Sequence, residues 1–141
     1  MLDKEQIMRI IPHRPPMLFL DEVLELEPGV SVAATMKLTG EEFFFSGHFP
    51  GNPVLPGVVM VEAMAQAGAV CVLSMPEYAG KTAYFAGIDG VKFKRKVCPG
   101  EILRLELQVV KIRGPVGVGM AAAYVGDQRA AFGELTFAVD I

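Results

Sequence analysis

Hydrophobic and polar positions along the chain single out one long apolar run. Residues 58–75 carry almost only apolar and small side chains, and a segment that is hydrophobic on every side predicts a helix buried in protein or in a membrane. Glu62 and Gln66 interrupt the run. Because they are four residues apart, they lie on one face of the helix. A carboxylate in such a helix is costly unless it is paired, neutral or used in chemistry.

Shorter patterns flank this run. Asp3 is a good N-cap for a short helix over residues 4–11. Alternating apolar positions predict two strands before the buried helix and four after it. The predicted strands cover residues 17–26, 30–38, 82–97 with a bulge at Asp89-Gly90, 101–113, 116–125 and 130–141. Pro76 ends the buried helix, and Gly126-Asp127 is a hairpin turn.

This order of elements favours one α+β arrangement. A sheet of this size has one face to bury, and a single apolar helix is available to cover it. The simplest solution wraps a curved antiparallel sheet around the helix, which is the hot-dog fold. The chain has 141 residues, enough for one core, so a single domain spanning 1–141 is expected.

Composition narrows the classes of function. Hydrophobic residues make up 52% of the chain and the mean hydropathy is +0.39, which suggests further burial at subunit interfaces and hence an oligomer. The net charge of −3 argues against nucleic-acid binding. Cys71 and Cys98 fit neither a disulfide framework nor a metal site, and we expect reduced thiols in the cytoplasm.

Targeting and membrane signals are also weak. The first residues lack the basic and apolar regions of a signal peptide. The apolar run approaches the length of a membrane span, but Glu62 near its middle would cost about 2.5–3.5 kcal/mol on insertion. We therefore expect no membrane span.

The loop before the buried helix is stiff. Residues 46–57 contain three prolines and three glycines, and His48 is the only ionisable side chain among them. Pro56 fits the first helical position, which would leave the amides of Gly57, Val58 and Val59 free at the positive end of the helix. Gly57 has no side chain, so a ligand could approach its N–H group closely.

Several motifs resemble one enzyme family. Residues 47–57 (GHFPGNPVLPG), followed by 62–66 (EAMAQ), resemble the signature of the 3-hydroxyacyl-[acyl carrier protein] dehydratases of type II fatty acid synthesis, FabZ type. Residues 13–21 (HRPPMLFLD), 84–89 (YFAGID) and 92–95 (KFKR) are also similar to that family. A sister dehydratase that also isomerises its product is longer and has Asp at the position of Glu62.

The resemblance implies the dehydration of a 3-hydroxyacyl thioester. Histidine side chains in general titrate near neutrality, so His48 would remove the proton at C2. Glu62 would protonate the departing hydroxyl, because desolvation in an apolar wall should raise its pKa and keep it protonated. The Gly57 amide would polarise the thioester carbonyl. This chemistry requires no metal and no organic cofactor.

The resemblance also implies a homodimer, commonly assembled as a trimer of dimers, with the histidine of one subunit facing the glutamate of the other. Tyr84 is the candidate gate of the acyl tunnel, and Gln66 a supporting hydrogen-bonding residue. The candidate tunnel lining is Phe49, Val54, Met60 and Phe85. Acyl carrier protein is acidic, so a basic run could steer it by charge. The residues of this chain that are candidates to contact acyl carrier protein are Arg14, Lys92, Lys94, Arg95 and Lys96.

Other interpretations stay open at this stage. The basic run could be the solvated edge of a strand. Gly57 could be only a packing glycine, and His13 is expected to brace the N-terminal segment. A hot-dog acyl thioesterase is the alternative enzyme, and a non-catalytic module that binds acyl carrier protein is the alternative outside enzymes.

Overall fold

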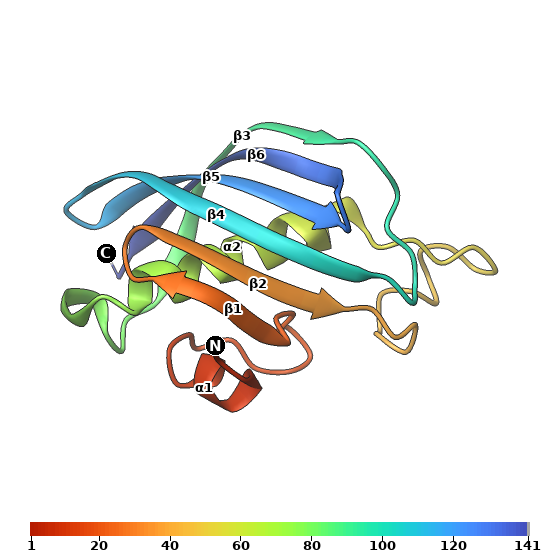
Figure 1. Ribbon diagram of the computed structural model, residues 1–141, viewed down its shortest axis with the longest axis horizontal. Helices are drawn as coiled ribbons and strands as arrows, with labels where there is room; N and C mark the ends of the chain where they lie inside the picture. The colour runs from red at the N-terminus through yellow and green to blue at the C-terminus, as the bar shows by residue number, and fades with distance from the viewer. Residues whose placement is uncertain (141) are drawn as a thin grey trace.

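The apolar run forms helix α2 (Gly57–Leu73), and a curved sheet of six antiparallel strands wraps around it (Figure 1). This computed structural model describes residues 1–140. The strands lie in the order β1-β2-β4-β5-β6-β3, so the hot-dog arrangement is confirmed. The other elements are α1 (Lys4–Met8), β1 (Glu22–Glu27), β2 (Ser31–Lys37), the 3-10 helix η1 (Pro76–Tyr78), β3 (Ala83–Phe93), β4 (Ile102–Arg113), β5 (Val116–Val125) and β6 (Gln128–Val139).

Small residues let α2 lie close to the sheet. A Cβ atom added at Gly68 would lie 2.7 Å from Cδ1 of Leu107 on β4, which is closer than side chains can approach. Ala63 and Ala67 are fully buried on the same helix. The helix therefore supplies the core with methyl groups and backbone, and Leu103, Leu105 and Leu107 of β4 fill the space between helix and sheet.

The N-terminal part of the chain is less regular than its sequence suggested. Helix α1 begins after Asp3 as predicted, and Asp3 and Gln6 cap each other, but the helix ends at Met8 and turns follow to residue 11. Strand β1 begins at Glu22, so the prediction of a strand from residue 17 was wrong for residues 17–21. The N–H groups of Met17 and Leu18 bond to the carbonyl of Arg14 in a turn, and Phe19 donates its N–H group to the side chain of Gln66. The Gln66 side chain thus takes the place of a strand partner at Phe19.

The C-terminal strands follow the predicted order. Strand β5 has the predicted bounds, and the bulge expected near Asp89-Gly90 is confirmed by a register shift in the pairing of β3 with β6. Strand β6 begins two residues earlier than predicted, and the last predicted residue, Ile141, lies outside the described residues. Both cysteines are free thiols.

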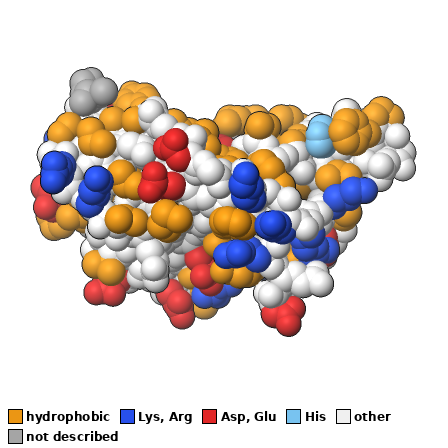
Figure 2. Space-filling model, turned by 90° about the horizontal axis from the view of Figure 1, so that it is seen from above, with side chains coloured by type: hydrophobic (Ala, Val, Ile, Leu, Met, Phe, Trp, Pro, Cys, Tyr) orange, Lys and Arg blue, Asp and Glu red, His pale blue; other side chains and the backbone are white. Residues whose placement is uncertain are grey.

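The two edges of the sheet differ. Leu2 pairs with Val23 and covers part of β1, whereas β3 pairs with β6 alone among the strands of residues 1–140. Large apolar side chains of β3 are about half exposed in the single subunit: Tyr84, Phe85, Ile88 and Phe93. On the face shown in Figure 2, hydrophobic side chains also lie between clusters of Lys and Arg. Within residues 1–140, no helix is both long and apolar enough to cross a membrane.

Candidate active site

Glu62 lies on α2 and is held by two neighbours. Gln66, one helical turn further on, donates a hydrogen bond from Nε2 to Glu62 Oε1 over 3.0 Å. Nε2 of His13 lies 3.4 Å from the same oxygen. Neither Glu62 nor His13 is fully buried, since their side chains are 24% and 22% exposed. The predicted shared face of Glu62 and Gln66 is confirmed.

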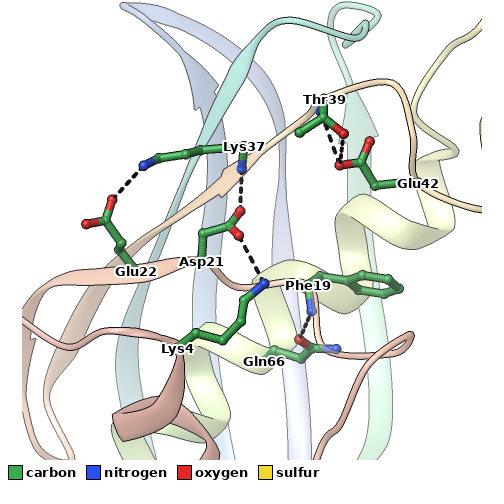
Figure 3. Close-up of polar contacts among 8 residues, drawn as sticks. All are labelled: Lys4, Phe19, Asp21, Glu22, Lys37, Thr39, Glu42 and Gln66. Atoms are coloured by element: carbon green, nitrogen blue, oxygen red, sulfur yellow. Dashed lines mark hydrogen bonds and ion pairs between the residues drawn. The ribbon is translucent and has the colours of Figure 1, made fainter.

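Gln66 ties the N-terminal segment to the helix. Its side chain is buried, its Oε1 accepts the N–H group of Phe19 (2.9 Å), and its Nε2 also donates to the carbonyl of Met17 (2.7 Å). Figure 3 shows the Gln66 amide beside the Phe19 backbone, below the pairs that Asp21 forms with Lys4 and Lys37. The segment that carries His13 is thereby fixed against the helix that carries Glu62.

The ionisation of Glu62 differs from the sequence-based expectation. Burial raises the pKa of Glu62, but the hydrogen bonds from His13 and Gln66 and the nearby His13 charge outweigh burial and lower the pKa below its usual value. The expectation of a raised pKa and a protonated resting carboxyl was therefore wrong for the single subunit. That expectation considered desolvation alone and did not include the hydrogen bonds from His13 and Gln66.

Glu62 opens onto a cavity of about 200 Å³. Four of the predicted site residues, Glu62, Gln66, Tyr84 and Phe85, line it together with His13. Most of the remaining wall is formed by small residues of α2 and by apolar side chains of the strands, among them Leu107, Leu135 and Phe137. The cavity therefore joins one carboxylate to an apolar space of the kind that an acyl chain requires.

His48 is oriented by the backbone of its own loop. Nδ1 lies 2.9 Å from the carbonyl oxygen of Val54, and the ring stacks on Phe49 with centroids 4.0 Å apart. The Val54 amide donates in return to the carbonyl of His48 over 2.8 Å. Because a carbonyl oxygen can only accept, the neutral imidazole carries its proton on Nδ1 and leaves the Nε2 lone pair free.

A second hollow surrounds His48. Its lining includes Val54, Gly57 and Met60, which are candidate substrate-binding residues, and the basic residues Lys94, Arg95 and Lys96, which are candidate carrier contacts. It shares no lining residue with the cavity at Glu62. Phe49 lines neither space; its ring is 51% exposed and borders a separate surface hollow. Within one subunit, the two candidate catalytic groups thus belong to different spaces.

The start of α2 departs from the prediction in one detail. Pro56 is the N-cap rather than the first helical residue, and its carbonyl accepts the N–H groups of Val59 and Met60. The Val59 amide is therefore not free, as was expected. The N–H groups of Gly57 and Val58 donate to no residue within 1–140. The Phe93 ring packs against Gly57, so a Cβ atom there would lie 2.9 Å from the ring, and glycine is also required for packing.

Two of the candidate carrier-binding residues already bind other groups of the protein. Arg95 forms an ion pair with Glu101 at 2.7 Å, whereas Lys92, Lys94 and Lys96 are exposed. Arg14 is exposed, but its guanidinium donates to the carbonyl groups of Ile11 and His13 and so closes the turn that holds His13. Among residues 1–140, no three His, Cys, Asp or Glu side chains come together as metal ligands would.

One site residue was missed by sequence reasoning. His13 was expected only to brace the N-terminal segment, yet its ring contacts Glu62 and lines the same cavity. Its Nδ1 atom is buried and has no hydrogen-bond partner within residues 1–140. No local pattern connects residue 13 to residue 62, because the contact depends on how residues 9–21 cross the helix.

The sheet wrapped around a helix defines a hot-dog protein, and similar solved structures share this fold. A chain of the dehydratase heterocomplex ApeI:P from Xenorhabdus doucetiae superposes with a TM-score of 0.83 at 18% identity, covering 96% of this chain and 91% of that one. The PaaI protein of E. coli superposes with a TM-score of 0.66 at 17% identity, covering 83% and 81%. At such identities, the likeness concerns the fold alone.

Sequence comparison identifies the family. Residues 11–134 match the FabA-like domain model. The chain is 55% identical to the 3-hydroxyacyl-[acyl-carrier-protein] dehydratase FabZ of Desulforamulus reducens, covering 99% of this chain and 98% of that protein. It is 51% identical to the FabZ of Moorella thermoacetica, covering 98% and 96%. The chain belongs to the FabZ-type 3-hydroxyacyl-[acyl-carrier-protein] dehydratases.

Proposed function

We propose that this chain is a hydro-lyase that dehydrates 3-hydroxyacyl chains carried on acyl carrier protein to trans-2-enoyl chains, in the cytoplasm and as a step of fatty acid biosynthesis. Its family membership supports the reaction class. An apolar cavity that ends at a carboxylate and a separate hollow that holds an imidazole with a free nitrogen support the chemistry. The reaction removes a proton from C2 and a hydroxyl group from C3.

His48 is the base at C2. The observation that carries this role is the contact between its Nδ1 and the Val54 carbonyl, because it leaves Nε2 as the atom that accepts a proton. This contact and the backbone hydrogen bond from the Val54 amide to the His48 carbonyl hold that atom in a fixed direction. Positioned proton transfer of this kind contributes about 10²–10⁴ in rate.

Glu62 donates to the departing hydroxyl, and Gly57 polarises the thioester carbonyl. Glu62 borders the apolar cavity, so its carboxyl group can reach a chain bound there. The N–H group of Gly57 stands at the first position of α2 with no acceptor within residues 1–140, and it borders the His48 hollow. Such a donor stabilises negative charge that develops on a carbonyl oxygen.

Each complete site requires two subunits. His48 and Glu62 line different spaces in one chain, so His48 of one subunit has to face Glu62 of another. Strand β3 supports this pairing, because it is an unpaired edge with exposed aromatic side chains that an isolated protein would not leave bare. Tyr84 and Phe85 border the Glu62 cavity, and Phe93 borders the His48 hollow. A twofold contact along β3 would join the two spaces into one tunnel, with Tyr84 as its gate, and three such dimers would form the hexamer.

The basic residues around the His48 hollow receive the carrier protein. Lys94 and Lys96 are exposed at its rim, and an acidic partner docked there would bring its thioester arm to His48. Lys92 extends the basic surface on the same segment, and Arg95 borders it with a guanidinium group already paired with Glu101. Arg14, whose guanidinium is held by the turn at residues 11–13, is a further candidate contact for the carrier.

A direct assay tests the proposal. The protein is incubated with 3-hydroxyacyl-[acyl carrier protein] of several chain lengths, and the products are followed by mass. We expect the loss of one water with the thioester intact, and the reverse hydration when a trans-2-enoyl thioester is supplied. Release of the free carrier thiol without an enoyl product would contradict the proposal and favour a thioesterase. Tight carrier binding without conversion in either direction would favour a non-catalytic module.

A further inference from the structure

The proposed acid raises a question about proton supply. Glu62 has to be protonated when it meets the departing hydroxyl, but its hydrogen-bonding partners in the subunit favour the charged form. A charged carboxylate cannot act as an acid until it receives a proton. A group that can supply this proton has to lie against the carboxylate and titrate near neutral pH.

His13 is placed for this role, because it lies against the carboxylate and histidine is the residue type that carries protons near neutral pH. Its Nε2 atom lies 3.4 Å from Glu62 Oε1, and it lines the same cavity. Tyr84 is the other titratable residue of that cavity wall within residues 1–140, and Gln66, which shares Oε1 with His13, cannot titrate. In the proposed dimer, His48 of the partner subunit also faces the site, but it serves the opposite proton, at C2.

The surroundings of His13 favour a fixed ring. Arg14 donates to the carbonyl groups of Ile11 and His13 at 3.0 and 2.8 Å, which closes the turn. Gln66 fixes the following segment through Met17 and Phe19. Both contacts on Glu62 use Oε1, and Oε2 accepts no hydrogen bond from residues 1–140. One carboxylate oxygen is thus held by the protein, and the other is available for substrate.

We propose that His13 is a positioning residue that orients Glu62 and shares with it the proton delivered to the departing hydroxyl. The inference rests on the proposed function. The C2–H bond breaks, and its proton passes to Nε2 of His48 while its electron pair forms the C2=C3 double bond. The C3–O bond breaks, and the oxygen takes a proton from Glu62 and leaves as water. The His13 imidazolium then returns a proton to Glu62. Both imidazoles exchange with solvent, His48 losing a proton and His13 gaining one.

Two substitutions separate orientation from proton sharing. His13→Ala removes both the contact and the titratable group, whereas His13→Gln keeps an N–H donor at a similar reach but cannot titrate. Arg9→Gln is the matched control, because Arg9 is exposed on the same N-terminal segment and its side chain makes no hydrogen bond or ion pair within residues 1–140.

The expected kinetic result is a loss of kcat with little change in KM. We expect His13→Ala to lower kcat about 100-fold, at the low end for one positioned proton-transfer group. His13→Gln should restore folding and KM but not kcat, and added imidazole should partly restore the rate of His13→Ala. The pH profile of kcat should lose one ionisation in both variants and be unchanged in Arg9→Gln. A His13→Gln enzyme with wild-type kcat and pH profile would overturn proton sharing.

A second readout does not depend on activity. Glutamate labelled with ¹³C at the carboxyl group reports the titration of Glu62, which is assigned by its absence in Glu62→Gln. Removal of His13 should move this titration to higher pH, because His13 holds the pKa of Glu62 down. An unchanged titration in a folded His13→Ala protein would overturn the pairing, even if the wild type dehydrates normally. A shifted titration in a protein without dehydratase activity would instead leave the pairing standing and remove the proposed function.

Discussion

Glu62 and His48 lie on one continuous segment of the chain, the first inside α2 and the second on the loop that leads into it, yet they are held in different ways. Glu62 is contacted by His13 and Gln66, which come from the N-terminal segment and from the helix itself. His48 is held within its own loop, by the Val54 carbonyl and the Phe49 ring. The cavity at Glu62 has a mostly apolar wall, and the hollow at His48 has a basic rim.

The difference suits the proposed mechanism, in which the site is divided between two subunits. The proposed acid, Glu62, lies on the buried helix α2, where contacts from a distant segment influence its ionisation. The proposed base, His48, lies on a loop whose geometry depends on prolines, glycines and backbone hydrogen bonds. In the proposed dimer, each half is formed within one subunit, and pairing of two subunits would complete the site. Substitutions that test this division should affect the Glu62 half and the His48 half separately.

Loss of either catalytic side chain should have the largest effect. We expect His48→Ala and Glu62→Gln each to lower kcat about 10²–10⁴-fold, because each removes one positioned proton-transfer group. When the two variants are expressed together, random pairing should restore about a quarter of the wild-type activity, because each mixed dimer of twofold symmetry contains one intact site.

Differently tagged subunits allow the mixed dimer to be isolated and assayed. Its activity should be about half that of the wild type per dimer, since one of two sites is intact. If the mixed dimer stays as inactive as its parents, then both residues act within one subunit, and the division described above is wrong.

Substitution of Gln66 should lower the free energy of unfolding, whereas a substitution in the His48 loop should change it little. Gln66→Leu leaves the Met17 carbonyl and the Phe19 N–H group unpaired, and we expect a loss of about 2–4 kcal/mol in the free energy of unfolding. Asn52→Ala on the loop is the control, because Asn52 is exposed and bonds only through its backbone. It should change stability by less than about 0.5 kcal/mol. Urea unfolding measures the free energy of unfolding of both variants. Similar losses in the two variants would contradict the expected difference between Gln66 and the His48 loop.

Sequence predicted most of the fold, because the relevant signals are local. The apolar run, the Gly126-Asp127 turn and the alternation in residues 116–125 each determine an element within a few residues. The contact between Glu62 and Gln66 was also predictable, since it follows from helical spacing alone. Residues that carry the family signature identified the candidate catalytic pair.

Contacts between distant segments could not be predicted in this way. Phe19 lies outside any strand, and its N–H group bonds to the Gln66 side chain, 47 residues away in the sequence. The same crossing brings His13 to Glu62, and this contact reverses the expected direction of the Glu62 pKa shift. Desolvation can be inferred from an apolar sequence pattern, but a specific partner requires the three-dimensional path of the chain.

The basic rim should affect carrier recognition and leave the chemistry intact. We expect Lys94→Glu with Lys96→Glu to raise KM for the carrier-bound substrate about 10-fold at low salt, through loss of electrostatic steering. The effect should shrink as salt screens the charges. A short pantetheine thioester should react as with the wild type. The control is Lys81→Glu with Lys111→Glu, which makes the same change in net charge at other exposed positions. An equal rise in KM for the control would show that net charge alone matters.

The pH dependence of stability should give the smallest effect, and its sign tests whether His13 and Gln66 keep Glu62 in its charged form. The folded-state pKa of Glu62 is lowered, so its ionised form stabilises the protein above the pKa of an unfolded glutamate, and this contribution disappears as pH falls through the folded-state pKa. The stability advantage of the wild type over Glu62→Gln should therefore be larger at neutral pH than in acid. Glu77→Gln, at an exposed position, controls for the loss of one negative charge. Urea unfolding across the acid range measures the difference, and an advantage that grows as pH falls would mean that burial, rather than His13 and Gln66, controls the carboxyl group.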